Sequence, residues 1–141
     1  MLKIALRDVM CEHPIKVKES VSVGNVAHLL FRYQINGILV VKDDSEDKLV
    51  GIFTTTDLLR LIDDAITKGV HSIDELQKVA QRPVGELASK EIITLQQEDK
   101  AVKAIALMHR KNVHTIPVYD GERLAGVVGR HDLINVALAI S

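Results

Sequence analysis

The segment GIFTTTDLL at residues 51–59 returns as GVVGRHDLI at residues 126–134, near the other end of this 141-residue chain. Glycine, aspartate and leucine stand at the same places in both copies. In each copy a short apolar run and a polar triplet follow the glycine, and the aspartate begins a stretch with the apolar spacing of a helix. The repetition predicts a chain built from two copies of one structural unit.

The rest of the sequence supports the duplication. A shift of 78 positions lays residues 4–43 onto residues 82–121 without a gap. The aligned apolar pairs include Ile15 with Ile93, Leu30 with Met108, and Ile38 with Ile116. The shift then falls to 75, because the loop after Val41 is three residues longer than its counterpart, as is common in surface hairpins. We expect two copies that close on each other rather than an open array of repeats.

The composition is that of a soluble globular chain. Hydrophobic residues make up 47% of the sequence and charged residues 26%, and the net charge of −1 gives no electrostatic footprint for nucleic acid or an anionic membrane. No apolar stretch approaches the roughly 18–20 residues of a membrane span, and Met1–Met10 lacks the apolar core of a signal peptide. Cys11 is the only cysteine, which excludes an intrachain disulfide and favours a cytoplasmic location.

Each copy is predicted to contain a strand, a helix, two strands and a second helix. In the first copy these are an extended segment at 14–17, a helix at 23–31, strands at 38–41 and 49–53 around a turn at 43–47, and a helix at 58–66. In the second copy they fall at 92–95, 100–111, 115–119, 124–128 and 132–139, with a turn at 120–123. The continuous aliphatic run at 38–41 indicates a strand buried on both faces.

A short helix is expected between the copies. Ser72 and Glu75 have the spacing of a capping box, which predicts a helix start, and Arg82-Pro83 ends the segment. The chain is thus divided into a first repeat at 1–67, a connecting segment at 68–83 and a second repeat at 84–141.

The order of the motifs carries a family resemblance. The chain combines Asp8-Val9-Met10, an amphipathic helix, the strand Thr-Ile-Pro-Val-Tyr-Asp at 115–120, a Leu-x-Gly step and a terminal Asp-Leu-Leu or Asp-Leu-Ile. Over nearly its whole length it resembles a tandem pair of CBS (cystathionine β-synthase) domains. The resemblance implies an α/β (α+β) fold of two βαββα repeats, packed sheet to sheet with pseudo-twofold symmetry, in a module that often forms a flat homodimer. It also implies clefts between the repeats that bind adenosine-containing ligands such as AMP, ADP, ATP or S-adenosylmethionine.

The first copy carries residue types suited to a nucleotide. A carboxylate can accept hydrogen bonds from both hydroxyls of a ribose, so Asp57 and its counterpart Asp132 are candidate ribose ligands. Phosphate oxygens are bound by N–H groups and hydroxyls at a helix N-terminus, which the threonines at 54–56 can supply. The candidates there are Thr54, Thr55 and Thr56. The family's nucleotide pattern, Gly-x-x-Thr/Ser-x-x-Asp, is matched in full by Gly51, Thr54 and Asp57.

The second copy departs from this pattern. Gly129 stands where the first copy has threonine, whereas Gly126 and Asp132 are kept. Three outcomes are open: the second cleft binds nothing, it binds with weaker phosphate contacts, or Arg130 and His131 act as cationic donors. By pseudo-symmetry, Arg130 and His131 can also reach a ligand anchored by Asp57.

The resemblance places adenine between the first extended segment and the start of the second strand. For the first site the residues are Ile15, Lys16 and Val17 with Gly37, Ile38 and Leu39. For the second they are Ile93, Thr94 and Leu95 with Thr115, Ile116 and Pro117. Lys16 either balances phosphate charge or extends to water.

Plainer interpretations of the same residues stay open. Asp57 and Asp132 can be ordinary helix-start carboxylates, which stabilise a helix by roughly 0.3–1 kcal/mol through its dipole, and the threonines can simply cap the helix. The histidines at 109, 114 and 131 lack a recognised metal spacing. Cys11 and His13 lack the companions of a nucleophilic site, so Cys11 is interpreted as structural.

The sequence therefore favours a non-catalytic regulatory module over an enzyme. Its ligand would be an adenine nucleotide, bound as a regulatory signal rather than as a required cofactor. The alternative is a ligand-independent dimerisation or interaction module that acts on a partner enzyme or transporter. No partner among nucleic acids or membranes is expected.

Overall fold

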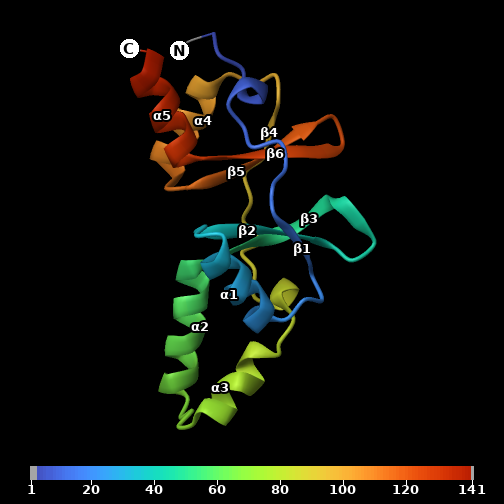
Figure 1. Ribbon diagram of the computed structural model, residues 1–141, viewed down its shortest axis with the longest axis vertical. Coiled ribbons are helices and arrows are strands. Elements are labelled where there is room, and N and C mark those ends of the chain that lie inside the picture. Colours follow the sequence, from blue (N-terminus) through green and yellow to red (C-terminus); the bar gives the residue numbers. More distant parts are fainter. Residues whose placement is uncertain (1–2, 141) are drawn as a thin grey trace. The chain divides into compact units, whose positions relative to one another are not determined.

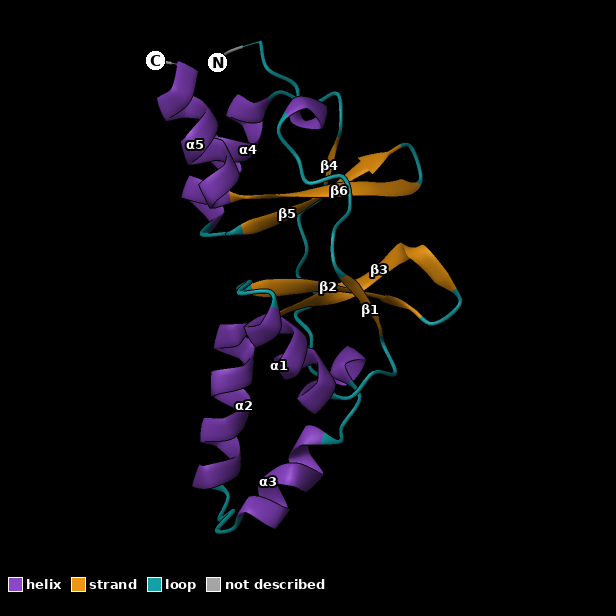
Figure 2. Cartoon of the chain, viewed as in Figure 1, coloured by secondary structure: helices purple, strands orange, loops and turns teal. Residues whose placement is uncertain are grey.

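The computed structural model describes residues 3–140, which form two compact units (Figure 1). The central unit is Ile15–Glu91, and the terminal unit joins Met1–Pro14 to Ile92–Ser141. Each unit has a three-stranded sheet with helices packed against it (Figure 2). The predicted class, α+β with the same βαββα order in both repeats, is confirmed.

The sheet of the central unit has the order β1-β2-β3. Its strands are β1 (Lys16–Lys18), β2 (Gly37–Lys42) and β3 (Ser45–Thr54). Its helices are α1 (Val23–Arg32), α2 (Thr55–Thr67), α3 (Ile73–Ala80) and a 3-10 helix at Val84–Glu86. β1 runs parallel to β2, since α1 connects them, whereas β2 and β3 form an antiparallel hairpin. The helices lie on one face of this sheet (Figure 2).

The core of the central unit follows from helix spacing and from the aliphatic strand. Ser22 caps α1, because its hydroxyl accepts the N–H of Asn25 at 3.2 Å. Val26 and Leu30, one helical turn apart, are buried in the same cluster as Phe53 of β3. Residues 38–41 are at most 2% exposed, which confirms the prediction of a strand buried on both faces.

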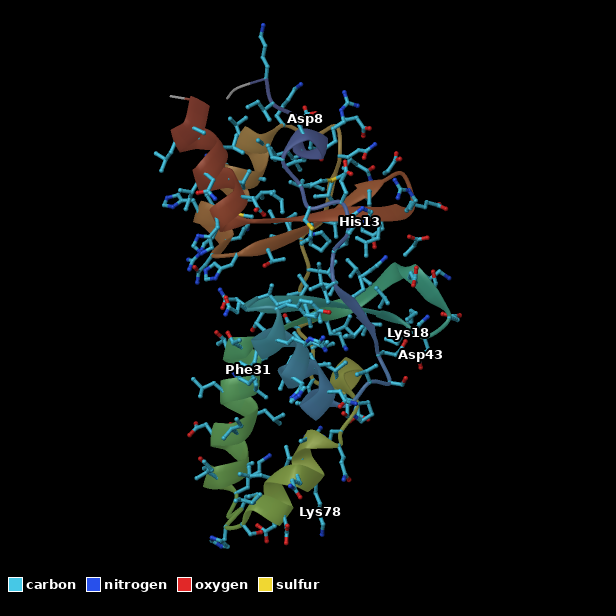
Figure 3. All side chains as sticks on the ribbon, viewed as in Figure 1. Asp8, His13, Lys18, Phe31, Asp43 and Lys78 are labelled. Atoms are coloured by element: carbon cyan, nitrogen blue, oxygen red, sulfur yellow. The ribbon has the colours of Figure 1, made fainter. Side chains whose placement is uncertain are left out.

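The hairpin between β2 and β3 is tighter than predicted. Ser45 already pairs with Lys42, so the turn is limited to residues 43–44 and the prediction of a turn over 43–47 is wrong. Asp43 is fixed by β1 and the residues after it: its backbone oxygen accepts the Lys18 ammonium at 2.8 Å, and its carboxylate accepts the Ser20 N–H and hydroxyl at 3.2 and 3.0 Å. Figure 3 shows Lys18 and Asp43 side by side. These contacts let the strands extend further than their polar sequence suggests.

The terminal unit repeats the same topology, with the order β4-β5-β6. Its strands are β4 (Leu95–Gln96), β5 (Thr115–Asp120) and β6 (Arg123–Gly129). Its helices are α4 (Ala101–Lys111), α5 (Arg130–Ile140) and a 3-10 helix at Leu6–Asp8. The predicted turn at 120–123 is again too long, because Asp120 pairs with Arg123, and Gly121 makes the reversal with a φ of 62°.

Both closing helices begin earlier than predicted. The polar triplets that follow β3 and β6 form the first turn of α2 and of α5, so the helices start at Thr55 and Arg130 instead of Leu58 and Asp132. Apolar spacing could not detect these turns, since they contribute polar side chains. The connecting helix α3 begins after Ser72 as predicted, but Glu75 accepts the N–H of His71 at 2.8 Å rather than that of Ser72.

The segment at the start of each repeat pairs with the sheet of the other repeat. Cys11 exchanges backbone hydrogen bonds with Val127 of β6 at 2.8 and 3.1 Å, and Ser89 does the same with Ile52 of β3 at 2.9 and 3.0 Å. Cys11 and Ser89 are equivalent positions of the duplication, 78 residues apart. The compact units therefore differ in membership from the two sequence copies.

This pairing explains the two repeated glycines. A Cβ atom on Gly51 would overlap the carbonyl oxygen of Ser89 and lie 2.9 Å from Ala88 Cβ. A Cβ atom on Gly126 would overlap the carbonyl oxygen of Cys11 in the same way. Both positions need glycine because another backbone approaches closely, and this requirement does not depend on a ligand.

Candidate functional site

The N-terminus of α2 is closed by a reciprocal capping box. Thr54, the last residue of β3, is the N-cap, and its hydroxyl oxygen accepts the N–H of Asp57 at 3.1 Å. Asp57 Oδ2 in turn accepts the N–H of Thr54 at 2.8 Å and its hydroxyl at 2.9 Å. The plainer interpretation of these residues as helix caps is thus correct, and it leaves the second carboxylate oxygen of Asp57 to be accounted for.

That second oxygen faces a cation that the sequence analysis missed. Arg60 Nη1 lies 3.3 Å from Asp57 Oδ1, with the Asp57 side chain 13% exposed and the Arg60 side chain 66% exposed. The signal in the sequence was the three-residue spacing of Asp57 and Arg60 on one helix face. An exposed guanidinium can turn away into solvent, which would leave Oδ1 able to accept two hydrogen bonds.

The backbone at the start of α2 is tied to the loop before β2. The N–H of Thr55 donates to the carbonyl oxygen of Asn36 at 2.9 Å. Within residues 3–140, the hydroxyls of Thr55 and Thr56 form no hydrogen bond; Thr55 is half-buried and Thr56 is exposed. Of the three threonines, these two hydroxyls remain available to an added anion, whereas that of Thr54 is already used.

The residues expected to line the adenine site lie on the same sheet. Gly37 of β2 is opposite Thr54 of β3 in register, and Lys16 of β1 is opposite Leu39. The N–H of Leu39 donates to the carbonyl oxygen of Ile15 at 3.4 Å. The side chains of Val17, Ile38 and Leu39 are buried, so a ligand in this unit would meet them mainly through backbone atoms.

Lys16 points its ammonium elsewhere. Its Nζ lies 3.4 Å from the carbonyl oxygen of Glu46, near the start of β3. Thr54 is at the other end of that strand, about 26 Å away at roughly 3.3 Å per residue. In this conformation Lys16 is not beside the threonines at the start of α2.

The terminal unit reproduces the backbone of this arrangement without the hydroxyl. The N–H of Gly129 donates to Asp132 Oδ2 at 2.8 Å, as Thr54 does to Asp57. The N–H of Arg130 donates to the carbonyl oxygen of His114 at 3.1 Å, as Thr55 does to Asn36. Asp132 is exposed, whereas Asp57 is half-buried.

Gly129 leaves room for a side chain. A Cβ atom at this position would lie 3.5 Å from Asp132 Oδ2 and 3.8 Å from the His114 carbonyl oxygen, both ordinary contacts. Packing therefore does not require glycine here, in contrast to Gly126.

The remaining second-site residues divide between β4, β5 and α5. Thr115 is opposite Gly129 in register, with Ile116 and Pro117 buried behind it in β5. Thr94 is exposed just before β4, and His131 is exposed on the first turn of α5. Arg130 lines a separate hollow of about 360 Å³ between α4 and α5, together with apolar residues such as Met108 and Leu133.

Two further features of the described residues bear on chemistry. Within residues 3–140, no group of histidine, cysteine, aspartate or glutamate side chains is arranged to hold a metal ion. Over the same range, none of the helices combines the length and the apolar character needed to cross a membrane.

Comparisons with known proteins agree on one family. The sequence model of the CBS domain matches residues 6–64 and 84–139. Among curated proteins, inosine-5′-monophosphate dehydrogenase of Methanocaldococcus jannaschii is 28% identical over 128 residues. That match covers 90% of this chain but 22% of the length of the dehydrogenase.

Solved structures share the fold over the full chain. The structure of CBSX2 in complex with AMP is similar with a TM-score of 0.78 and 24% identity, covering 97% of this chain and 98% of that one. The CBS domain pair of protein MJ0100, in complex with 5′-methylthioadenosine and S-adenosyl-L-methionine, has a TM-score of 0.74 and 22% identity, with coverage of 97% and 98%.

Proposed function

The chain belongs to the CBS domain family, and from this premise we propose that it is a regulatory module that binds an adenosine-containing ligand through Asp57 of the central unit. AMP, ADP or ATP is the ligand class we propose. CBSX2, whose structure is similar to that of this chain, holds AMP, and the CBS domain pair of MJ0100 holds 5′-methylthioadenosine and S-adenosyl-L-methionine, which supports a ligand with an adenosine moiety.

The observation that carries the proposal is that the two carboxylate oxygens of Asp57 have different partners. Asp57 Oδ2 is committed to the cap, whereas Oδ1 faces the solvent-exposed Arg60. A carboxylate held rigidly by its cap and offering one oxygen can accept both hydroxyls of a ribose at little entropic cost.

The neighbouring groups fit the other parts of a nucleotide. The hydroxyls of Thr55 and Thr56 and the positive end of the α2 dipole can bind phosphate oxygens. Adenine is proposed to lie beside residues 15–17 and 37–39, as the family resemblance implies.

In the terminal unit we propose a weaker counterpart. Asp132 is held by one backbone N–H, without the hydroxyl that fixes Asp57, so its orientation is less constrained. Arg130 and His131 stand in place of Thr55 and Thr56 and offer cationic donors to a phosphate. The binding experiment described next, repeated on Asp132→Ala, decides whether these two residues serve a ligand anchored by Asp132 or one anchored by Asp57.

The experiment is a calorimetric titration and thermal-shift panel with AMP, ADP, ATP, S-adenosylmethionine and NADH. Asp57→Ala is expected to abolish the strongest binding isotherm. Asp99→Ala is the matched control, because Asp99 also accepts a backbone N–H three residues earlier, that of Gln96 at 2.9 Å, and pairs with Lys103 at 3.6 Å. Binding that Asp57→Ala leaves unchanged, or no binding in any titration, contradicts the proposal.

A second candidate function, association with another copy of the chain, is favoured by exposed apolar side chains. On α2, Leu59, Ile62 and Ile66 are 68, 37 and 57% exposed and share one helix face. Phe31, at the end of α1, is 68% exposed as well (Figure 3). A row of large apolar side chains on one face is unusual for a monomer, so we propose a homodimer that buries it.

Sedimentation equilibrium tests this second proposal. The double substitution Leu59→Lys with Ile66→Lys is expected to turn a dimer into a monomer, because it places two charges on the buried face. Ile73→Lys is the control, since Ile73 is 74% exposed but lies on α3. A wild-type monomer, or a dimer that survives the double substitution, contradicts it.

We propose that ligand binding to the module regulates the activity of a partner enzyme or transporter. The chain spans less than a quarter of the length of the dehydrogenase it matches, so that enzyme's reaction is not transferred to it. A ligand can shift such a partner only by its difference in affinity for two states of the module. A cytoplasmic location remains a prediction.

A further inference from the structure

The two oxygens of Asp57 differ in the room they leave for a ligand. Oδ2 already accepts the N–H and the hydroxyl of Thr54, at 2.8 and 2.9 Å, which uses both of its lone-pair directions. Oδ1 accepts one donor, Arg60 Nη1, at 3.3 Å. A ribose bound by Asp57 must therefore donate to Oδ1, the oxygen that Arg60 also reaches.

This shared oxygen brings the arginine close to the rest of the ligand. In an adenosine ligand the 5′ substituent is only a few bonds from the 3′ hydroxyl, well within the screening length of about 8 Å at physiological salt. The Arg60 side chain is 66% exposed and carries five N–H donors, one of which reaches Oδ1. When both ribose hydroxyls donate to Oδ1, its two lone-pair directions are filled and the Arg60 donor is released, so that the guanidinium can meet an anion on the ligand.

We call the proposed ligand site at Asp57, Thr55 and Thr56 the central half-site. We infer that Arg60 makes this half-site selective for adenosine ligands whose 5′ substituent is negatively charged, an inference that rests on the proposed function. A phosphate would form charge-assisted hydrogen bonds with the guanidinium. A neutral thioether would form none, and a sulfonium cation would be repelled. The half-site thus takes nucleotides in preference to the thioether and sulfonium ligands of the MJ0100 structure.

The terminal unit has no arginine at the position equivalent to Arg60. The residue equivalent to Arg60 is Asn135, which is neutral and exposed, so the cation three residues after the aspartate is present in only one copy. Arg130 precedes Asp132 instead and lines the hollow between α4 and α5. Selection by Arg60 is therefore a property of the central half-site.

The test compares three adenosine ligands that differ in the charge at the 5′ position: AMP, 5′-methylthioadenosine and S-adenosylmethionine. Dissociation constants are measured by calorimetry for the unsubstituted chain and for Arg60→Gln, Arg60→Lys and Arg82→Gln. Arg82 is the matched control, because it is 48% exposed in the same unit and pairs with Glu86 at 3.7 Å, outside the half-site.

Arg60→Gln is expected to weaken AMP binding about tenfold or more, the effect of one charged hydrogen bond, while the affinity for 5′-methylthioadenosine is unchanged. Arg60→Lys should retain the preference for AMP, and Arg82→Gln should alter no affinity.

Two results overturn the inference and leave the proposed function intact. One is a wild-type protein that binds the three ligands equally; the other is an equal loss of AMP and 5′-methylthioadenosine binding in Arg60→Gln, which would give Arg60 the role of holding Asp57. A wild-type protein that binds none of the three overturns the proposed function itself.

Discussion

The hydroxyl of Thr54 donates to Asp57 Oδ2 at 2.9 Å and, through its oxygen, accepts the N–H of Asp57 at 3.1 Å. One pair of side chains thus caps α2 and fixes the orientation of the carboxylate. A helix-capping role and a ligand-binding role for Asp57 are compatible, because they use different oxygens.

Removing the Thr54 hydroxyl should cost both stability and binding. In Thr54→Ala the N-cap is lost, and we expect the free energy of unfolding to fall by about 1 kcal/mol. Urea unfolding measures this, and the same variant should bind AMP more weakly because Asp57 gains freedom. Thr56→Ala is the control for stability, since Thr56 is exposed and caps nothing. An equal loss in both variants would show that the cap contributes nothing.

Supplying the missing hydroxyl should improve the terminal unit. Gly129→Thr places a side chain where the nearest atoms to its Cβ lie 3.5 and 3.8 Å away, so we expect no clash. The new N-cap should raise the free energy of unfolding by a few tenths of a kcal/mol, the usual difference between threonine and glycine caps. Calorimetry should then show a stronger second site for AMP. A destabilised variant would mean that the backbone at Gly129 does not accept a side chain.

The duplication, the order of elements and the buried strand at 38–41 could be predicted, because they depend on apolar periodicity and repeated motifs. The pairing of each repeat's first segment with the sheet of the other repeat, at Cys11 and Ser89, could not be predicted. It consists of backbone hydrogen bonds, which leave no pattern in side-chain polarity. The same holds for the first turns of α2 and α5, which are built from polar residues.

At the start of α2, the residue types alone predicted that Asp57 is a helix-start carboxylate and that the threonines can cap the helix. The reciprocal pairing of Thr54 with Asp57 was not predicted. Arg60 was overlooked because the family pattern stops at the aspartate. Gly51 was assigned to the nucleotide motif, whereas its surroundings show that the approach of Ser89 is what requires it. Sequence spacing alone could not separate a glycine kept for packing from one kept for a ligand.

Gly51 should therefore be intolerant of even a methyl group. In Gly51→Ala the new Cβ would meet the backbone of Ser89, which cannot turn away as a flexible side chain can. We expect a loss of about 1–3 kcal/mol in the free energy of unfolding, typical of overpacked sites. Gly129→Ala is the matched control, with nothing nearer than 3.5 Å to its Cβ. Equal stability of the two variants in urea would contradict the pairing of Ser89 with Ile52.

Because the first segment of each repeat packs on the other repeat, a core mutation in that segment should destabilise the other repeat. Leu6 lies at the start of the first repeat, yet it is fully buried in the cluster of the terminal unit with Leu95 and Leu133. Val84 is its equivalent, 78 residues later, and is fully buried in the cluster of the central unit. Leu6→Ala should cost about 2–5 kcal/mol, as cavities of this size do.

Hydrogen exchange read out by mass spectrometry can locate that loss. Leu6→Ala should reduce amide protection mainly in α4 and β5, far away in sequence, and Val84→Ala should reduce it mainly in α1 and β2. Each variant serves as the control for the other. If Leu6→Ala instead exposed the amides of α1 and β2, the first segment would pack on its own repeat, and Gly126 would lose its reason to be glycine.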